Sequence, residues 1–393
     1  MSEPAVPFGN YQFEIYLKGL AGTLPALPTS YKELESTAQQ ALSAEAFGYV
    51  AGGAGEEITV KANRAAFERW RIVPRMLVDV TERDLSTTVL GTDLPAPVMF
   101  APVGVMSIVH DEAEKAVARA ARELGLPMIL SNAASNTMED VATELQDTPR
   151  WFQLYWPTDN DLAVSFVGRA KDAGYRAIVV TLDTRLLAWR PRDLARAYLP
   201  FLKGEGVANY LQDPVFRKAL DKSPEEDPQA AIGHWATLFS NPGLSWDDLA
   251  FLQDHTDLPI VLKGVLHPDD ARKAVDAGVD GLIVSNHGGR QVDGAIAALE
   301  ALPEIVDAVP GDFPVLFDSG IRTGADVFKA IALGARAVLV GRPYVWGLGL
   351  GGQEGVKQVL RSLLADFDLT VALSGYTKLS DVGQQALRRT DAL

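Results

Sequence analysis

The stretch Gly281-Leu282-Ile283-Val284-Ser285-Asn286-His287-Gly288-Gly289-Arg290-Gln291 joins a short apolar run to a polar loop with two glycines. The apolar, β-prone run predicts a buried parallel strand that ends at Ser285. On the loop, a histidine that can exchange a proton near neutral pH stands three residues before an arginine that can grip a carboxylate. The stretch therefore suits a substrate with a carboxylate and an acidic proton on the neighbouring carbon. A capped loop with a surface arginine is the alternative.

The rest of the chain repeats a strand-and-helix rhythm that indicates a barrel. The expected strands are Pro97–Ala101, Pro127–Leu130, Arg150–Leu154, Ala177–Leu182, Pro259–Leu262, Gly281–Val284, Pro314–Phe317 and Ala335–Val340. The expected helices are Glu112–Leu124, Met138–Leu145, Asp161–Ala173, Trp246–Thr256, Pro268–Ala277, Ala298–Val309, Gly324–Leu333 and Gly355–Phe367. Helix ends are marked by Gly125, Gly174, Gly278 and Gly334. Eight repeats of similar size predict a closed (β/α)₈ TIM barrel of the α/β class, with a doubly wound open sheet as the alternative.

Two segments fall outside this rhythm. Residues 1–75 read as an N-terminal helical extension, with helices expected at 31–42, where Ser30 and Glu33 match the capping-box pattern, and at 45–50. Residues 184–245 form a long insertion after the fourth strand, rich in proline and glycine. Because it rises from the end of a barrel where active sites lie, we interpret it as a lid; a solvated insertion without a catalytic part is the alternative. We expect residues 1–393 to form a single domain.

Composition excludes several classes of function. The chain has 393 residues, a formal net charge of −15 and no clustered Lys and Arg, so nucleic acid and anionic membranes are poor partners. It has no cysteine, which excludes disulfides, thiolate chemistry and Cys-based metal sites, and we expect no metal. Residues 1–10 lack the features of a secretory signal, and no apolar run approaches the roughly 18–20 residues that span a bilayer. A cytoplasmic enzyme without a membrane partner is the default expectation.

Polar residues follow nearly every expected strand, at the end where barrel chemistry collects. Lys263 ends the fifth strand, where a lysine can form a Schiff base or act as a fixed cation; a lysine that reaches out to solvent is the alternative. Gly-Arg pairs follow the seventh and eighth strands, at Arg322 and Arg342, which is the usual phosphate site of barrels.

Amide and hydroxyl groups at other strand ends suit the edge of a heterocycle. These are Gln153, Thr181 and Ser131. The cation of Lys263 suits a ring that becomes anionic when it accepts electrons. Together with the phosphate corner, these groups predict a flavin mononucleotide (FMN) site beside a carboxylate-substrate site.

At this point the sequence resembles the family of FMN-dependent α-hydroxy-acid oxidases and dehydrogenases, from about residue 31 to the last helices. The resemblance rests on the motifs Ser285-Asn286-His287-Gly288-Gly289-Arg290-Gln291, Phe152-Gln153-Leu154-Tyr155, Thr181-Leu182-Asp183-Thr184, Leu262-Lys263-Gly264, Asp318-Ser319-Gly320-Ile321-Arg322 and Gly341-Arg342-Pro343. It implies a (β/α)₈ barrel with FMN at its mouth, a small 2-hydroxy acid and O₂ as substrates, and a homo-tetramer or homo-octamer.

The resemblance also implies roles for individual residues. His287 is expected as the base, Asp183 as its partner, and Arg190 and Arg290 as the carboxylate clamp. Tyr49 and Tyr155 are expected as hydroxyl donors to the substrate. Lys263 is expected beside flavin N1 and O2. The remaining expected cofactor contacts are Ala101, Pro102, Val103, Gly104, Ser131, Gln153, Thr181, Ser285, Gly288, Asp318, Gly320, Arg322, Gly341 and Arg342, with His287 also close to the flavin.

Within the family the chain is most similar to the lactate 2-monooxygenases. The long loop after the fourth strand, the segment 188–194 and Gly104 carry this likeness. It implies that lactate is oxidised to pyruvate, which is held until acetate, CO₂ and water can form. A plain oxidase that releases the keto acid and H₂O₂ is the alternative, and a dehydrogenase or a non-catalytic binding barrel are further readings. Ala133 and Leu187 stand where larger pocket residues are expected, so a longer 2-hydroxy acid is also considered.

Overall fold

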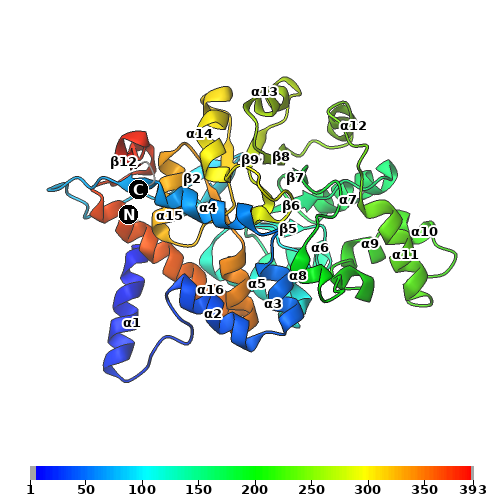
Figure 1. The fold of residues 1–393 in the computed structure, drawn as a ribbon, viewed down its shortest axis with the longest axis horizontal. Helices are drawn as coiled ribbons and strands as arrows, with labels where there is room; N and C mark the ends of the chain where they lie inside the picture. Colours follow the sequence, from blue (N-terminus) through cyan, green and yellow to red (C-terminus); the bar gives the residue numbers. More distant parts are fainter. Residues whose placement is uncertain (1–5, 391–393) are drawn as a thin grey trace.

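The computed structural model describes residues 6–390. Its centre is a closed barrel of eight parallel strands in the order β10-β11-β4-β5-β6-β7-β8-β9 (Figure 1). The strands are β4 (Val98–Phe100), β5 (Met128–Ser131), β6 (Arg150–Leu154), β7 (Ile178–Thr181), β8 (Ile260–Val265), β9 (Gly281–Val284), β10 (Val315–Phe317) and β11 (Val338–Val340). Each coincides with an expected strand to within three residues at either end. The predicted (β/α)₈ barrel is therefore confirmed.

One helix follows each strand of the barrel. They are α5 (Ala113–Leu124), α6 (Met138–Leu145), α7 (Asn160–Asp172), α12 (Asp248–Asp254), α13 (Pro268–Asp276), α14 (Ala298–Ala308), α15 (Gly324–Ala332) and α16 (Arg342–Leu373). The four glycines predicted as helix ends all have positive φ, from 66° at Gly125 to 106° at Gly334. The last helix is longer than the one we expected at 355–367. Helix α16 begins at Arg342, because Pro343 is tolerated in a first turn, and it runs on through a kink at Gly351 and Gly352.

The barrel strands are buried on both faces, which explains their continuous apolar runs. Alternate residues such as Ile129, Val261 and Ile283 fill the interior, while their neighbours pack against the helices. A hairpin of β2 (Thr87–Val89) and β3 (Thr92–Leu94) packs against this interior cluster. The indole N–H of Trp151 donates to Thr92 Oγ1 at 3.0 Å. The interior and the hairpin end of the barrel are thus mainly apolar, and the polar side chains lie at the opposite end.

The N-terminal extension contains α1 (Tyr11–Leu20), α2 (Tyr31–Ala41), α3 (Ala44–Ala51) and α4 (Ile58–Glu68). It ends in β1 (Trp70–Ile72), which pairs antiparallel with β12 (Leu387–Arg389) near the end of the chain. The capping box predicted at Ser30 and Glu33 is wrong: Ser30 has extended backbone, but its side chain makes no capping hydrogen bond. The sequence pattern correctly indicates where the helix begins, but it does not determine the rotamer of the Ser30 side chain. Ser43 does cap α3, accepting from the N–H of Ala46.

The insertion 184–245 contains helices of its own, unlike the long loop we expected. They are α8 (Pro191–Leu194), α9 (Ala208–Leu211), α10 (Pro214–Lys218) and α11 (Pro228–Phe239), gathered at one side of the barrel in Figure 1. Each of Pro191, Pro214 and Pro228 begins a helix. Phe201, Tyr210, Phe216, Trp235 and Phe239 form an aromatic core inside the segment.

No helix among residues 6–390 is long and apolar enough to cross a membrane. The prediction that a secretory signal is missing concerns residues 1–10, and the first five of these lie outside the described residues.

We expect Gly324→Ala to destabilise the protein strongly. Gly324 begins α15, and a Cβ there would overlap the backbone of Asp366 and Phe367 in α16, which cannot yield as a side chain can. Such overpacking costs about 3 kcal/mol at the upper end of its usual range. The matched control Gly233→Ala lies in α11 with open space around it and should gain about 1 kcal/mol from helix propensity. Thermal unfolding midpoints test the pair; an unchanged or raised midpoint in Gly324→Ala would contradict the packing.

Candidate active site

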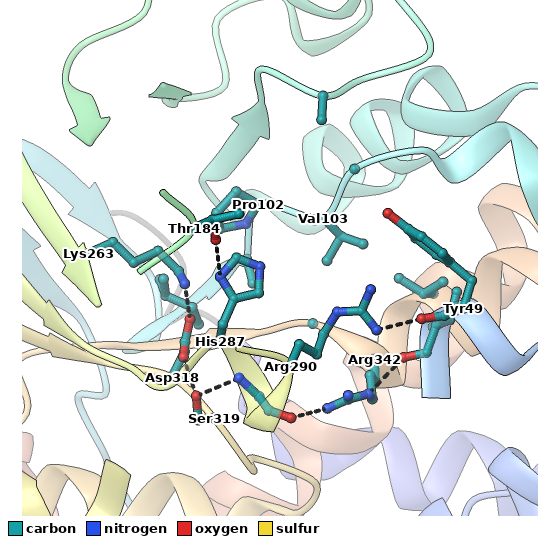
Figure 2. A pocket seen from close by; sticks show the side chains of 18 of the residues that line it. Tyr49, Pro102, Val103, Thr184, Lys263, His287, Arg290, Asp318, Ser319 and Arg342 are labelled. Atoms are coloured by element: carbon teal, nitrogen blue, oxygen red, sulfur yellow. Dashed lines mark hydrogen bonds and ion pairs between the residues drawn. The ribbon is translucent and has the colours of Figure 1, made fainter. Parts of the chain in front are cut away.

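A deep pocket opens at the carboxyl ends of the barrel strands (Figure 2). It encloses about 1070 Å³ of space between protein atoms, counted out to its open mouth. All the expected substrate contacts line it: Tyr49, Tyr155, Arg190, His287 and Arg290. So do the expected cofactor contacts Ala101, Pro102, Val103, Gly104, Lys263, Gly288, Asp318, Gly320, Arg322, Gly341 and Arg342. Asp183, Ser131, Gln153, Thr181 and Ser285 do not reach the lining and lie behind it at the strand ends.

The loop after β9 holds His287 in an unusual backbone conformation. His287 has φ 58°, and the next two residues, both glycines, also have positive φ. Neighbouring hydroxyls fix this turn: Ser285 Oγ accepts from the N–H of His287, and Ser319 Oγ accepts from the N–H of Gly288, both at 3.0 Å. Positive φ in a non-glycine residue is costly and persists only where the surroundings enforce it. The loop is therefore built to present one imidazole to the pocket.

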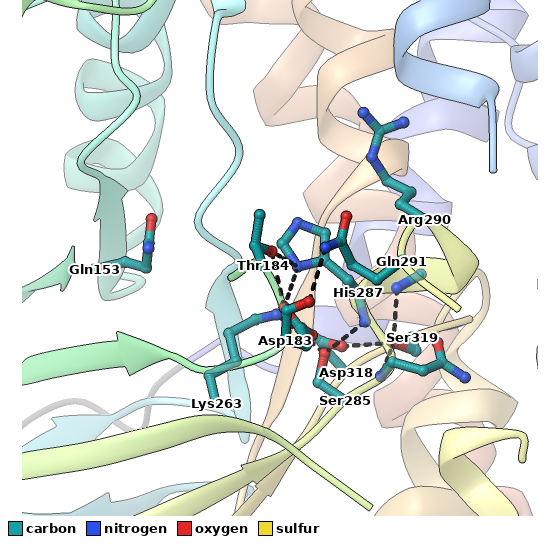
Figure 3. A network of polar contacts seen from close by, with 12 residues as sticks. Gln153, Asp183, Thr184, Lys263, Ser285, His287, Arg290, Gln291, Asp318 and Ser319 are labelled. Carbon is teal, nitrogen blue, oxygen red and sulfur yellow. Dashed lines mark hydrogen bonds and ion pairs between the residues drawn. The ribbon is translucent and has the colours of Figure 1, made fainter. Parts of the chain in front are cut away.

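The imidazole of His287 is paired with a buried carboxylate (Figure 3). Its Nδ1 lies 2.8 Å from Asp183 Oδ1 and 3.3 Å from Thr184 Oγ1. Burial lowers the pKa of His287 below its ordinary value of 6.5, and the charges of Lys263 and Arg190 add to this, while Asp183 offsets it only in part. Burial acts to raise the pKa of Asp183, but His287, Lys263 and hydrogen bonds outweigh it and bring that pKa to about 2. A neutral imidazole beside an ionised carboxylate is poised to accept a proton at Nε2.

Two buried guanidinium groups lie beside the imidazole. Arg190 donates to the carbonyl of Arg290 at 3.1 Å and to Gln291 Oε1 at 2.7 Å. Arg290 donates to the carbonyls of Tyr49 and Gly52 and stands 5.0 Å above the ring of Tyr49. Burial, followed by the charge of Arg190, lowers the pKa of Arg290 to about 10. Neither arginine forms a salt bridge with a carboxylate among residues 6–390, so this part of the pocket favours an anionic ligand.

Lys263 is buried in the second half of β8, between β7 and β9, the strands that precede Asp183 and His287. Its Nζ donates to Ser285 Oγ at 3.0 Å and lies 3.2 Å from Asp318 Oδ2. Burial lowers the pKa of Lys263, but Asp318 and Asp183 outweigh that effect and raise it above the ordinary value. Lys263 is thus a fixed ammonium ion, which disfavours the Schiff-base role that the sequence left open.

Polar atoms at the strand ends behind the pocket are left without partners. Gln153 Nε2 and Thr181 Oγ1 are buried and make no hydrogen bond within the described part of the chain, whereas Gln153 Oε1 accepts from Ser131 Oγ at 2.9 Å. Buried donors of this kind are normally satisfied. They fit a ligand with a polar, planar edge.

Another corner of the pocket is rich in glycine and arginine. Arg342 donates to the carbonyls of Val50, Gly52 and Gly288 at 2.9–3.0 Å. Burial, with the neighbouring charge of Arg322, lowers the pKa of Arg342 to about 9. Two adjacent cations that lack a carboxylate partner in residues 6–390 fit a phosphate group.

Gly104 stands against the loop after β5. A Cβ at this position would come within 2.8 Å of the carbonyl oxygen of Ala133 and 3.0 Å of its Cβ. This supports the packing interpretation of Gly104. Ala133 and Leu187 both line the pocket, as the sequence suggested.

Several pocket residues escaped the sequence analysis as site residues. Thr184 and Ser319 lie inside the quoted motifs and could have been found from their places beside Asp183 and Asp318. Phe201 and Phe239 come from the insertion and line the pocket from the lid side. Nothing in their local sequence marks them, because their place depends on how the insertion folds back.

Comparisons with known proteins agree with this geometry. The family description "FMN-dependent dehydrogenase" matches residues 38–389. The chain is 46% identical to an FMN-dependent alpha-hydroxy acid dehydrogenase of Penicillium citrinum, over 98% of this chain and 97% of the relative. It is 42% identical to an L-lactate oxidase of Lysinibacillus sphaericus, over 97% of each chain. The crystal structure of a mandelate oxidase superimposes with a TM-score of 0.82 and 40% identity, covering 93% of this chain and 99% of that one.

The chain therefore belongs to the FMN-dependent dehydrogenase family. It is an FMN-dependent oxidoreductase, and relatives of this family are named as oxidases of hydroxy acids. The residues present fit the cofactor: unpartnered Gln153 Nε2 and Thr181 Oγ1 suit the edge of the ring, and Arg322 and Arg342 suit its phosphate.

We expect a small unreactive dicarboxylate such as oxalate to bind this pocket, and Arg290→Met to weaken that binding. Losing one partner of a buried charge pair costs about 2–5 kcal/mol, or thirtyfold or more in affinity. Arg290→Lys should restore only part of it, because lysine lacks the planar fork. Oxalate titration followed by flavin absorption measures the dissociation constants.

The matched control is Arg192→Met. Arg192 lies in α8, two residues after the clamp residue Arg190, but its half-exposed side chain is paired with Glu57 and does not line the pocket. Equal weakening in Arg192→Met and Arg290→Met would show that the effect is general and not due to the clamp.

Proposed function

We propose that this protein is a lactate 2-monooxygenase, which converts L-lactate and O₂ to acetate, CO₂ and water. The observation that carries the proposal is the meeting of a neutral, Asp183-supported His287 with the buried cations Arg190 and Arg290 in one pocket. A base beside two arginines is what oxidation of a carbon next to a carboxylate requires.

Substrate binding is assigned to the two arginines. The carboxylate of the hydroxy acid would replace the counter-charge that Arg190 and Arg290 lack, which fixes the acid end of the substrate. Burial raises the pKa of Tyr155, so its hydroxyl stays protonated as a donor. Tyr49 stands under Arg290 and offers a second hydroxyl. The rest of the substrate then faces His287.

His287 is assigned the proton transfer. Its Nδ1 is engaged by Asp183, which leaves Nε2 to take the proton from the substrate as the substrate is oxidised. Asp183 then stabilises the imidazolium, a charge-assisted contact worth about 2–3 kcal/mol.

Bound FMN would supply the two-electron redox chemistry that links oxidation of the substrate carbon to reduction of O₂. Its ring edge would meet Ser131, Gln153 and Thr181, and the ammonium of Lys263 would stabilise negative charge on the ring. Asp318 holds Lys263, and Ser285 orients it. The phosphate would lie at Gly320, Arg322, Gly341 and Arg342.

Retention of the keto acid is assigned to the lid, residues 184–245. Its aromatic side chains Phe201 and Phe239 line the pocket and pack on the lid's own core, and Phe239 lies 5.2 Å from the ring of Tyr155. A packed cover of this kind excludes water and slows product release. Slow release would let H₂O₂ meet the keto acid before the two separate.

A second candidate is a 2-hydroxy-acid oxidase that releases the keto acid and H₂O₂. Two observations favour it: relatives over nearly the whole chain are named L-lactate oxidase, and Leu187 is 47% exposed at the pocket wall. The two candidates share every step up to the oxidised product.

We also propose a cytoplasmic homo-oligomer, a tetramer or octamer. The family resemblance suggests this oligomeric state. Helix α1 supports it, because an exposed apolar face of this kind is typical of a contact between subunits; its exposed side chains are Phe13, Tyr16, Leu17 and Leu20.

Product analysis under air tests the function. The proposal predicts about one acetate and one CO₂ for each lactate consumed, with little H₂O₂, because the keto acid stays in the closed pocket. Assays of acetate, pyruvate and H₂O₂ on the purified flavoprotein measure this. Stoichiometric pyruvate and H₂O₂ would instead identify the oxidase.

His287→Gln tests the base. We expect it to bind FMN and to lose at least about a hundredfold in the rate of anaerobic flavin reduction by lactate, the lower end of the usual contribution of a general base. In the wild type the rate should fall as pH drops through a pKa below 6.5, because protonation removes the base. The variant should lack this acid limb. Near-normal reduction in His287→Gln would reject His287 as the base.

A further inference from the structure

The lid contacts the rest of the protein at several points, and one of them, residues 201–209, lies on the loop after β5 beside the pocket. At one end Phe201 lines the pocket. At the other end the side chain of Asn209 accepts from the N–H of Met138 at 2.9 Å and donates to the carbonyl of Asn132 at 3.1 Å. Between them, the N–H of Ala208 donates to the carbonyl of Ala134 at 3.2 Å. The stretch therefore rests on the loop after β5.

Within this stretch, Glu205 binds one barrel loop directly, at Ser107, and a second loop through Ser107, at Ser135. Ser107, in the loop after β4, donates its hydroxyl to the carboxylate of Glu205. Ser135, in the loop after β5, has its Oγ 2.7 Å from Ser107 Oγ. Because the hydrogen of Ser107 is engaged by Glu205, Ser135 is the donor of this second bond. We call Glu205, Ser107 and Ser135 the lid clasp.

The barrel side of the clasp is held by hydrogen bonds to one buried carboxylate. Buried Glu114 accepts from the N–H groups of Ser135 and Asn136, at 3.1 Å, and of Met106, at 3.3 Å. Its carboxylate thus ties the loops after β4 and β5 together beneath the clasp. Glu205 is then the member of the clasp that moves when the lid moves.

The residue after Glu205, Gly206, is tightly packed against the wall of the pocket. Gly206 has φ 73°, and a Cβ there would come within 2.7 Å of Val105 Cγ2 and 3.0 Å of the carbonyl of Ala133. The same carbonyl faces Gly104 on the pocket side. Because Gly206 packs closely against the side chains of Val105 and Phe201 and the carbonyl of Ala133, we expect a shift of the neighbouring Glu205 to be felt at this wall of the pocket.

We propose that Glu205 is a positioning residue, whose clasp sets how long the keto acid stays in the pocket. This rests on the proposed function. In the step concerned, the bond between the keto carbon and the carboxylate breaks and CO₂ leaves. One oxygen of H₂O₂ enters the new acid, and the other leaves as water. An opened clasp lets the keto acid escape before this step.

Glu205→Ala tests the proposal. Loss of a half-exposed hydrogen bond to a charged group costs about 1 kcal/mol, so the acetate-to-pyruvate ratio under air should fall about fivefold. The inhibition constant of pyruvate should rise by a similar factor. Anaerobic flavin reduction by lactate should stay within about twofold, because the clasp does not contact the base or the clamp. Ser135→Ala should act in the same direction, as a second variant if Glu205→Ala folds poorly.

Two controls fix the interpretation. Glu205→Gln keeps an acceptor for Ser107 and should stay close to the wild type in both readouts. Glu225→Gln alters an exposed lid carboxylate that is paired with Arg217 at 2.8 Å within the lid, and it should change neither readout. An unchanged product ratio and inhibition constant in Glu205→Ala would overturn the proposal. So would a loss of flavin reduction as large as the loss in ratio, since that indicates general damage.

The clasp and the proposed function can fail separately. If the wild type releases only pyruvate and H₂O₂, the monooxygenase proposal fails. The inhibition constant of pyruvate then still tests the clasp, because it reports retention whatever follows it.

Discussion

The pocket holds more buried positive charge than the protein's own carboxylates balance, and much of the surrounding structure serves to hold that charge in place. Lys263 is paired with Asp318, but Arg190, Arg290 and Arg342 have no carboxylate partner among residues 6–390. Unpaired buried charges are costly, so the pocket is incomplete without anions. Burial is the main cause of the lowered pKa of His287, and the charges of Lys263 and Arg190 lower it further. Two of the groups that give the pocket its positive charge thus also help to keep the base neutral.

The N-terminal extension supplies the partial negative charge that makes this arrangement tolerable. The last carbonyls of a helix lack partners and carry the negative end of its dipole. At the end of α3, the carbonyls of Tyr49, Val50 and Gly52 accept from Arg290 and Arg342. Farther along, Asn63 of α4 and Asn286 exchange reciprocal amide hydrogen bonds of 2.8 and 2.7 Å, and Asn286 caps the His287 turn. The extension is therefore part of the site's support.

The barrel could be predicted from sequence because its strands are buried on both faces and its helices stop at glycines. The wrong predictions concerned residue types that are found in two kinds of local structure. Pro191, Pro214 and Pro228 suggested a loop, yet each begins a helix. Most of the pocket residues could be predicted because they follow the carboxyl ends of the strands, which a barrel brings together at one end. Phe201 and the Asn63–Asn286 pair could not be foreseen, because those contacts join segments far apart in the chain.

The small residues of the pocket wall limit what can tune its shape. Gly104 and Gly206 both lie against the Ala133 carbonyl, and neither position has room for a Cβ. A glycine at 104 is therefore required by packing, whatever else it does for the reaction with O₂. The width of the pocket can instead be varied by substituting side chains that line it without moving the backbone, namely those of Ala133 and Leu187. In the function we propose, substrate size would be set at this wall by side-chain volume, and keto-acid retention by how firmly the lid is held.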